Sequence, residues 1–362
     1  MSDDRPDVEG RTCPVPLPHD ARIVLGHGGG GVLTRELVER VFLPAFSNPV
    51  LAGLGDAALL PGASWPGGML ADGARVAFST DAFVVQPLLF PGGSIGDIAV
   101  NGTINDLAMS GALPVALSAA FVLEEGLDVA ILSRIVSDMG RAARRAGVAI
   151  VTGDTKVVER GRGDGMTVTT AGIGIVPARS RLGSLSPAPG DVVLVSGTVG
   201  DHGMAVMSVR EGLAFESPIE TDSAALHGLV AGLLAACPDV RLLRDPTRGG
   251  LVTTLGELVT GKGYGIEFEE GAVPVDAAVA AACEILGLDP FHVACEGRLV
   301  AVVPADRADA ALAALRADPL GGRAARIGRI VADHPGFVVA RTAVGATRIV
   351  PMPLGEQLPR IC

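Results

Sequence analysis

Apolar residues along the first half of the chain occur in short runs and in longer stretches with a period near 3.6, separated by polar or glycine-rich residues. Short runs are typical of strands, and the longer stretches are typical of amphipathic helices. Helices are predicted at residues 34–43, 95–109 and 130–146, and strands at 74–80, 115–123, 148–152 and 166–176. Thr34 is the expected cap of the first helix, and Pro44 its expected end.

The second half repeats this alternation, which predicts an α/β or α+β fold. Strands are predicted at 192–196, 265–268, 299–303 and 337–340, and helices at 204–211, 223–236, 251–260, 276–286 and 308–317. Residues 177–190 show little pattern and predict a domain boundary. The expected organisation is a flexible arm (1–21), an N-terminal domain (22–177), a C-terminal domain (186–342) and a mobile tail (343–362), which three prolines keep extended.

Composition excludes several classes of protein. A net charge of −11 and an aromatic content of 3% do not suit nucleic-acid binding. No apolar run reaches the roughly 18 residues of a membrane helix, and residues 112–123 come closest. Because no basic segment and apolar core open the chain, we expect a cytoplasmic protein. Five scattered cysteines without a C-x-x-C pair argue against a disulfide framework or a zinc knuckle.

Glycine is in excess, with 49 residues, and four of them follow His27 as Gly28, Gly29, Gly30 and Gly31. Consecutive backbone N–H groups before a helix can surround phosphate oxygens. A flexible linker in a turn-rich protein is the alternative, since the chain has no G-x-x-x-x-G-K-[ST] motif.

Acidic residues recur beside glycine or at the ends of predicted strands. Asp81 and Asp154 each follow a predicted strand, and Asp56 lies in a glycine-rich turn. The predicted helix 95–109 carries a polar stripe at i, i+4 and i+8 with a further carboxylate beside it: Asp97, Asn101, Asn105 and Asp106. Carboxylate and amide oxygens suit Mg²⁺ that holds a polyphosphate. For any single aspartate, capping of a helix or turn is the alternative.

Two further residues carry possible chemistry. Lys156 follows Asp154 closely and is one of only two lysines, the other being Lys262. It can neutralise phosphate or move a proton, or it can be an ordinary surface lysine. Cys362 ends the chain, where Arg360 favours the nucleophilic thiolate and the terminal carboxylate opposes it. A frayed terminus is the alternative.

The C-terminal half offers three polar segments whose role the residues leave open. They are 197–203 with His202, the Arg/Asp-rich loop 244–250, and 295–298 with Glu296. The loop can form an ion pair or bind a ligand. His202 and Glu296 are by default structural.

Together, these segments resemble the HypE family of hydrogenase maturation proteins, in the superfamily of aminoimidazole ribonucleotide synthetase, selenophosphate synthetase and thiamine-monophosphate kinase. The resemblance runs from about residue 22 to the end, over segments 23–36, 48–58, 78–81, 94–114, 153–156, 196–212, 244–250, 296–298 and the terminal Pro-Arg-Ile-Cys, 359–362. It implies a PurM-like two-domain fold. The N-terminal sheet would form a barrel in a homodimer, and the C-terminal domain would be an α/β sandwich.

The resemblance also implies a reaction. A carbamoyl group derived from carbamoyl phosphate would reach Cys362 from the carbamoyltransferase HypF. ATP, bound with Mg²⁺ near the domain junction, would phosphorylate the carbamoyl oxygen, and loss of phosphate would leave a thiocyanate. The cyanide would pass to iron on the HypC–HypD complex for a [NiFe]-hydrogenase.

The resemblance assigns roles residue by residue. It makes Cys362 the carrier and Glu296 the base, assisted by Lys156. Asp81, Asp106, Asp154, Asp56 and Asn105 match positions for Mg²⁺ and ATP, and Gly28, Gly29, Gly30 and Gly31 would close over phosphate. The arm with Cys13 lies outside the resemblance. Cys295 stands where asparagine is expected at least as often.

Two other hypotheses remain. A selenophosphate synthetase-like enzyme would need a reactive cysteine with a lysine near its N-terminus, but Cys13 has only prolines around it. A non-catalytic scaffold would present its tail without ATP turnover.

Overall fold

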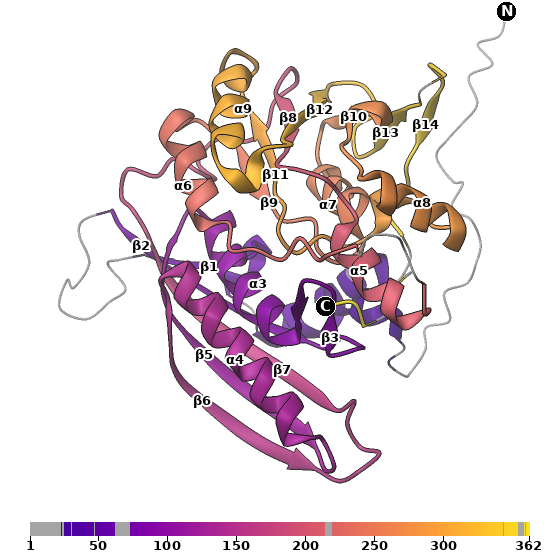
Figure 1. Cartoon of the computed structure of the whole chain (residues 1–362). Helices are drawn as coiled ribbons and strands as arrows, with labels where there is room; N and C mark the ends of the chain where they lie inside the picture. The colour runs from indigo at the N-terminus through magenta and orange to yellow at the C-terminus, as the bar shows by residue number, and fades with distance from the viewer. Residues whose placement is uncertain are drawn as a thin grey trace, which may run out of the picture.

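The computed structural model arranges the chain as two sheets, one above the other, with the C-terminus between them (Figure 1). It describes residues 23, 25–29, 31–46, 48–61, 73–213, 219–342, 344–353, 358 and 360–362. The expected arm 1–21 with Cys13, together with Gly30 and Pro359, lies outside these residues.

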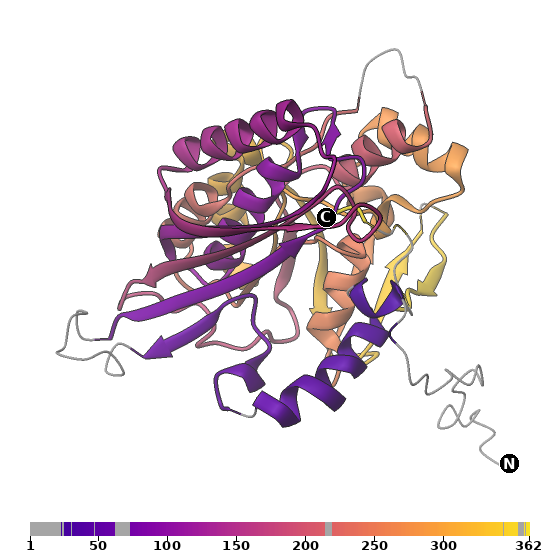
Figure 2. The same cartoon turned by 90° about the horizontal axis from the view of Figure 1, so that it is seen from below.

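Within the described residues, the N-terminal sheet has five strands in the order β1-β2-β7-β5-β6. They are β1 (Ala58–Pro61), β2 (Arg75–Phe83), β5 (Leu113–Glu124), β6 (Ala149–Val158) and β7 (Met166–Val176), and a small hairpin adds β3 (Leu89–Phe90) and β4 (Gly93–Ser94). Helices α3 (Ile95–Met109) and α4 (Val129–Ala146) cover one face of the sheet (Figures 1 and 2). β5 and β6 are parallel, and α4 is the crossover between them.

Local signals explain why the two helices match their predictions well. Ser94 and Asp97 form a capping box at the start of α3, so Asp97 is a cap and not a ligand. Asp128 caps α4, and Gly147 ends it in the left-handed conformation. α3 is buried on nearly all sides because it lies between the sheet, α4 and the C-terminal unit.

The first helix differs from its prediction. It begins as α1 (Val32–Leu37), continues through a π-turn, η2 (Val38–Phe42), and ends as α2 (Leu43–Phe46), between the 3-10 turns η1 (Leu25–Gly28) and η3 (Leu51–Gly53). Gly31, not Thr34, is the N-cap. Pro44 does not end the helix, because the π-turn changes the hydrogen-bond register before it and proline is tolerated at the start of a helical segment.

The part of the C-terminal sheet that the structure describes has seven strands in the order β14-β13-β10-β12-β8-β11-β9. They are β8 (Val192–Val195), β9 (Leu242–Arg244), β10 (Gly265–Glu269), β11 (Val300–Val303), β12 (Ala325–Val331), β13 (Val338–Arg341) and β14 (Thr347–Ile349). The helices are α5 (Asp201–Arg210), α6 (His227–Ala236), α7 (Gly250–Val259), α8 (Ala277–Leu286) and α9 (Ala308–Ala317). The apolar pattern missed β12, because Arg326 and Arg329 interrupt it and a register shift lies at Gly328.

One apolar core joins the two units. It contains Ile98 and Ile135 from the N-terminal helices, Met204 from α5, and Cys283 from α8. Ile361 of the tail belongs to the same core. The units therefore pack as one body around the end of the chain.

The polar stripe on α3 fastens the same junction. The Asn105 amide nitrogen donates to the carbonyls of Ala224 (3.0 Å) and Glu296 (3.2 Å), and its oxygen accepts from the Leu226 N–H (2.8 Å). Asn101 donates to the Ser223 hydroxyl at 3.0 Å. The stripe therefore holds the loop that precedes α6.

None of the helices in the described parts of the chain is long and apolar enough to cross a lipid bilayer.

Replacing Asn105 tests this junction. Asn105→Ala removes three hydrogen bonds from a buried amide to buried or half-buried backbone groups, so we expect the free energy of unfolding to fall by about 2–4 kcal/mol in a urea titration. Asn101→Ala, which removes one bond, is the matched control with an expected loss of about 1 kcal/mol. If Asn105→Ala instead leaves stability unchanged and weakens ATP binding, Asn105 binds the nucleotide rather than joining the two units.

Candidate active site

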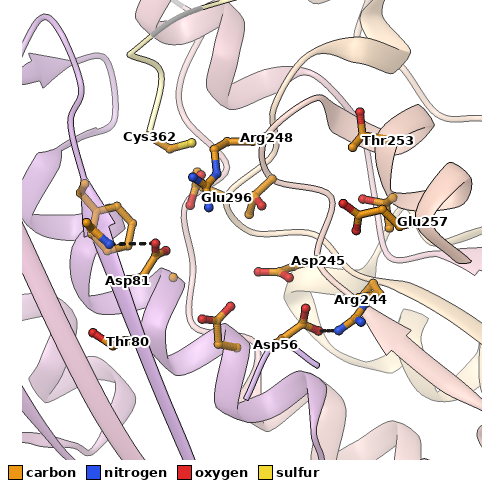
Figure 3. Close-up of a pocket in the computed structure, with 16 residues that line it drawn as sticks. Asp56, Thr80, Asp81, Arg244, Asp245, Arg248, Thr253, Glu257, Glu296 and Cys362 are labelled. Carbon is orange, nitrogen blue, oxygen red and sulfur yellow. Dashed lines mark hydrogen bonds and ion pairs between the residues drawn. The ribbon is translucent and has the colours of Figure 1, made fainter. Parts of the chain in front are cut away.

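A cavity of about 250 Å³ lies where the two units meet (Figure 3). The N-terminal unit contributes Asp56, residues 80–83 of β2, and Gly102 and Asp106 of α3. The C-terminal unit contributes part of the loop before α7, polar residues of α7 itself, and Glu296. Cys362 closes the lining at one side, so the last residue of the chain faces groups from both units.

Carboxylates dominate this lining. Among the described residues, two arginines, Arg244 and Arg248, line the cavity. Six acidic side chains line it with them: Asp56, Asp81, Asp106, Asp245, Glu257 and Glu296. Asp56 forms an ion pair with Arg244. The Ser79 hydroxyl donates to Asp106 at 2.5 Å. Acidic groups therefore outnumber basic groups in the described lining of the cavity.

The excess charge changes the acidity of the cluster. Burial raises the pKa of Asp106 well above its usual value, and the charges of Asp245, Asp56 and Asp81 raise it further. Burial and the charge of Asp56 raise the pKa of Asp245 to about 7. Burial, with Asp245 next, also raises the pKa of Glu296 well above its usual value. Such mutual perturbation is typical of a site completed by a cation or a charged substrate.

Three buried polar atoms in the cavity lining have no hydrogen-bond partner within the described residues. They are Glu296 Oε1, Thr253 Oγ1 and Arg244 Nε. An unsatisfied buried polar group costs about 1–3 kcal/mol. Because the set includes both donors and acceptors, the cavity suits a polar ligand with several oxygens and N–H groups.

Cys362 is held in the cavity rather than left at the surface. Cys362 lies close enough to Glu296 to lower the pKa of its carboxyl group, against the larger effect of burial, and Arg248 lies beside both in Figure 3. Ile361 is 2% exposed and anchors the terminus in the core. A thiol, a carboxyl group and a guanidinium group therefore meet at one end of an acidic cavity.

Glu296 owes its position to the residues around it. Its N–H donates to Asp222 Oδ1 at 3.0 Å. A side chain on Gly297 would come within 1.7 Å of the Asp222 carbonyl oxygen, so only glycine fits there. Arg298 donates to the Thr198 carbonyl at 2.9 Å. The turn carrying Glu296 is thus fastened on both sides.

Cys295, beside Glu296, is a structural residue in this arrangement. Its sulfur accepts a hydrogen bond from the Gly200 N–H at 3.3 Å, at the start of α5. Burial raises the pKa of the thiol well above its usual value, so it stays protonated. Its effect is to hold the two segments together.

The structure places two residues expected at the site away from the cavity. Asp154 and Lys156 are inside β6 and not after a strand, with side chains 65% and 71% exposed, and they form an ion pair of 2.9 Å. A hydrogen bond from Lys156 lowers the pKa of Asp154. Gly153 permits the close approach of β6 to β5, since an added Cβ would lie 2.0 Å from the Ala119 carbonyl oxygen. Neither charged side chain belongs to the described lining of the cavity.

The other residues expected at the site also differ in how they lie relative to the cavity. Asp81 lines the cavity, although it lies within β2 rather than after it. The glycine-rich loop approaches the site, because Arg248 donates to the Gly28 carbonyl at 3.2 Å. Asn105 is occupied by backbone groups, as described above. Its role in nucleotide binding, like that of Gly28, Gly29, Gly30 and Gly31, stays a prediction.

Sequence reasoning left out three lining residues of α7, namely Thr253, Thr254 and Glu257. Thr253 and Glu257 are four positions apart on a mostly apolar helix, which is the same signal that singled out α3. The preceding loop, whose role had been left open, supplies Arg244, Asp245 and Arg248.

The raised pKa of Asp245 predicts how stability depends on pH. The folded protein binds a proton at Asp245 up to about pH 7, whereas the unfolded chain releases it near 3.8, so stability falls as pH rises between these values. Asp245→Asn removes this effect. We expect the variant to exceed the wild type in Tm by several degrees at pH 8, with no gain below about pH 4, in thermal unfolding without divalent cations. An equal difference at both pH values would contradict the assignment.

Comparison with known proteins identifies the family. Two family models match, "AIR synthase related protein, N-terminal domain" at residues 54–176 and its C-terminal counterpart at 188–341. A carbamoyl dehydratase HypE of Cupriavidus necator is 53% identical over 341 residues, which cover 94% of this chain and 95% of that protein.

Solved structures agree with this similarity. The crystal structure of a HypE–HypF complex includes a chain that is 44% identical, with a TM-score of 0.79 over 88% of this chain and 99% of that one. A HypE structure in complex with ATP is 46% identical, with a TM-score of 0.75 over 94% of this chain and 100% of that one. The chain belongs to the AIR synthase related family and, within it, to the HypE proteins.

Proposed function

We propose that this chain is an ATP-dependent carbamoyl dehydratase of hydrogenase maturation, which converts a thiocarboxamide on Cys362 to a thiocyanate. The observation that carries the proposal is the position of Cys362, which lies beside Glu296 in an acidic cavity between the two units. The similarity to carbamoyl dehydratases and to a HypE structure with ATP supports the same conclusion.

The reaction removes the elements of water from the carbamoyl group. The carbamoyl oxygen attacks the γ-phosphorus of ATP and ADP leaves, while one N–H proton is lost and a C=N bond forms. The second N–H proton and the phosphate then leave, and the S–C≡N group remains on the sulfur. Phosphorylation is required because a free carbonyl oxygen is a poor leaving group. Covalent attachment to the tail replaces diffusion with proximity.

Glu296 is suited to accept these protons only when it is ionised. Without a ligand, burial and neighbouring carboxylates keep its pKa high, so the group holds its proton. Positive charge near the carboxylates lowers such a pKa again. Binding of a positively charged ligand near Glu296 would therefore switch this residue from acid to base. The family resemblance gives Lys156 the role of assisting it.

Mg²⁺ is part of this proposal. Among the residues that the structure describes, no three His, Cys, Asp or Glu side chains already stand close enough to hold a metal ion. The mutual rise in pKa of the carboxylates nevertheless fits a cation, since hard oxygen donors are what Mg²⁺ prefers. Asp81 and Asp106 would hold it, with Asp56 and Asp154 as further expected ligands. The ion would neutralise polyphosphate charge.

A homodimer would explain why Asp154 and Lys156 lie away from the cavity of their own chain. The face of the N-terminal sheet opposite α3 and α4 exposes apolar residues, among them Phe78 and Ile173, which pair in register and are 44% and 41% exposed. β6 forms the free edge of the described sheet and is exposed along most of its length. A second copy covering this surface would carry its own β6 towards the site of the first.

Two partners complete the cycle. A structure of a relative with HypF supports a HypF-type carbamoyltransferase as the donor. The family resemblance makes HypC–HypD the expected acceptor of cyanide, and the cytoplasm the expected location. Both exchanges require Cys362 to leave the cavity, so the tail has to move.

Cys362→Ala tests the carrier role. With ATP, carbamoyl phosphate and a HypF-type transferase, the wild-type terminal peptide should gain a carbamoyl group and then lose one water in intact mass. The variant should do neither, while ATP affinity stays within about twofold. Cys13→Ala, outside the family resemblance, is the matched control and should react as the wild type does. Dehydration without ATP would support the scaffold hypothesis. A selenophosphate synthetase-like enzyme would leave Cys362 unmodified.

Lys156→Ala tests the assisting group, and Lys262→Ala, the other lysine, is its control. We expect carbamoylated Lys156→Ala to lose at least about tenfold in the dehydration rate, as general acid–base groups contribute roughly 10²–10⁴-fold, while the Lys262 variant is unaffected.

Mixing subunits then tests whether Lys156 acts across a dimer. Heterodimers of Lys156→Ala and Cys362→Ala chains have one intact pair of Lys156 and Cys362 only if the two act on different chains. We expect activity to return to part of the wild-type level when the two inactive variants are mixed. Continued inactivity in a verified heterodimer would place Lys156 in its own chain's site or outside catalysis.

A further inference from the structure

The last three residues of the tail are fixed through their carbonyl groups. The Arg360 carbonyl accepts from the Gln86 N–H at 3.1 Å, and a terminal oxygen of Cys362 accepts from the Val84 N–H at 3.3 Å. Arg360 has φ 57°, which is uncommon for a residue other than glycine and requires surrounding contacts to hold it. The terminus is therefore paired with residues 84–86, and the carbonyl of the intervening Ile361 needs a different donor.

His202 is that donor. The imidazole Nε2 lies 2.9 Å from the Ile361 carbonyl oxygen, and the ring is completely buried near the start of α5. A carbonyl oxygen only accepts, so Nε2 carries the hydrogen. Nδ1 then accepts from the Thr221 hydroxyl at 2.8 Å, and that hydroxyl accepts in turn from the Ser223 N–H at 3.1 Å. Each nitrogen of the ring has a defined role.

The surroundings of His202 keep its imidazole uncharged and restrict its movement. Burial lowers the pKa of His202 to about 4, so at neutral pH the ring is a hydrogen-bond donor without charge. Phe90 packs edge-on against it, with ring centroids 5.3 Å apart at 84°. Arg210, at the other end of α5, donates to the Arg360 carbonyl at 2.6 Å. One helix thus holds two successive carbonyls of the tail.

A buried histidine with two partners is usually only a structural residue. Here, however, one partner is the segment that carries Cys362, whose thiol is half-buried in the lining of the cavity and, in the proposed cycle, has to move out to meet a transferase. The bond from His202 to Ile361 is therefore made and broken with each movement of the tail. Its donor belongs to α5, whereas the cavity lies beside α3 and α7.

We propose that His202 is a positioning residue for the reaction: its neutral imidazole holds the Ile361 carbonyl and thereby sets the Cys362 thiol in the cavity. This role rests on the proposed function for its chemical consequence, but the docking itself does not. With the backbone fixed on both sides of the thiol, a group carried on sulfur has little freedom. Misplacement by about 1 Å can reduce a rate about 10²-fold.

The first experiment measures docking without any assay of the reaction. Cys362 in the full-length protein is alkylated with iodoacetamide at pH 7.5, and the terminal peptide is followed by mass. We expect His202→Phe, which keeps an aromatic ring without a donor, to react about tenfold faster, the equivalent of about 1.4 kcal/mol for one lost hydrogen bond. His202→Gln, which restores a donor, should stay within about threefold of the wild type.

Thr221→Val is a second variant that changes no core volume. It removes the group that fixes the imidazole tautomer, so alkylation should accelerate by about threefold while Tm changes little. If His202→Phe and Thr221→Val both react at the wild-type rate, His202 does not hold the tail and the proposal is overturned.

The second experiment separates positioning from damage to the fold. In single turnover with a HypF-type transferase, His202→Phe should accept the carbamoyl group at the wild-type rate or faster and dehydrate it at least about tenfold more slowly. Equal losses in both steps would contradict a positioning role. If the wild type itself fails to dehydrate, the proposed function fails, while the alkylation rates still decide whether His202 docks the tail.

Discussion

Repulsion among buried carboxylates is the interaction on which the site depends. Asp81 and Asp106 come from the N-terminal unit, and Asp245 and Glu296 from the C-terminal unit, so the two sheets bring like charges together as they pack. Loss of water around these groups raises their pKa values, and each charge raises those of its neighbours. Arg244 forms an ion pair with Asp56, and its charge also lowers the pKa of Asp245 and of Glu257 against the larger effect of burial. The fold thus stores an electrostatic cost that the proposed cation would relieve.

This cost is tolerated because the surrounding junction is apolar and well fastened. The shared core places α5 and α8 against α3 and α4, and Asn105 ties the loop before α6 to α3. Neither unit alone contains the cavity. Substrate binding and packing of the two units are consequently linked, because the same residues line the cavity and join the sheets.

The interactions that dock the tail are weak enough in free energy for the tail to leave the cavity and return. Burial of Ile361 contributes about 2 kcal/mol, and each neutral hydrogen bond to a carbonyl about 1 kcal/mol, before the entropy of ordering the segment is subtracted. A carrier must be held firmly enough to react and loosely enough to leave. The N-terminal sheet also has an exposed apolar face, and β6 is its free edge. A second copy of the chain would cover both.

The sequence by itself determined the elements with strong local signals, as at α3 with its capping box. It also singled out Cys362, Asp56, Asp81 and Asp106 as candidates, and the family resemblance added Glu296; all of these line the cavity. It failed where local signals conflict, at Pro44 after a π-turn and at β12, whose arginines hide a strand. Only the tertiary structure decided that Asn105 joins the two units, that Asp154 and Lys156 lie on an exposed edge, and that His202 meets Ile361. Periodicity and capping act over a few residues, whereas the contacts of Asn105 and His202 join residues more than a hundred positions apart, and packing alone sets them.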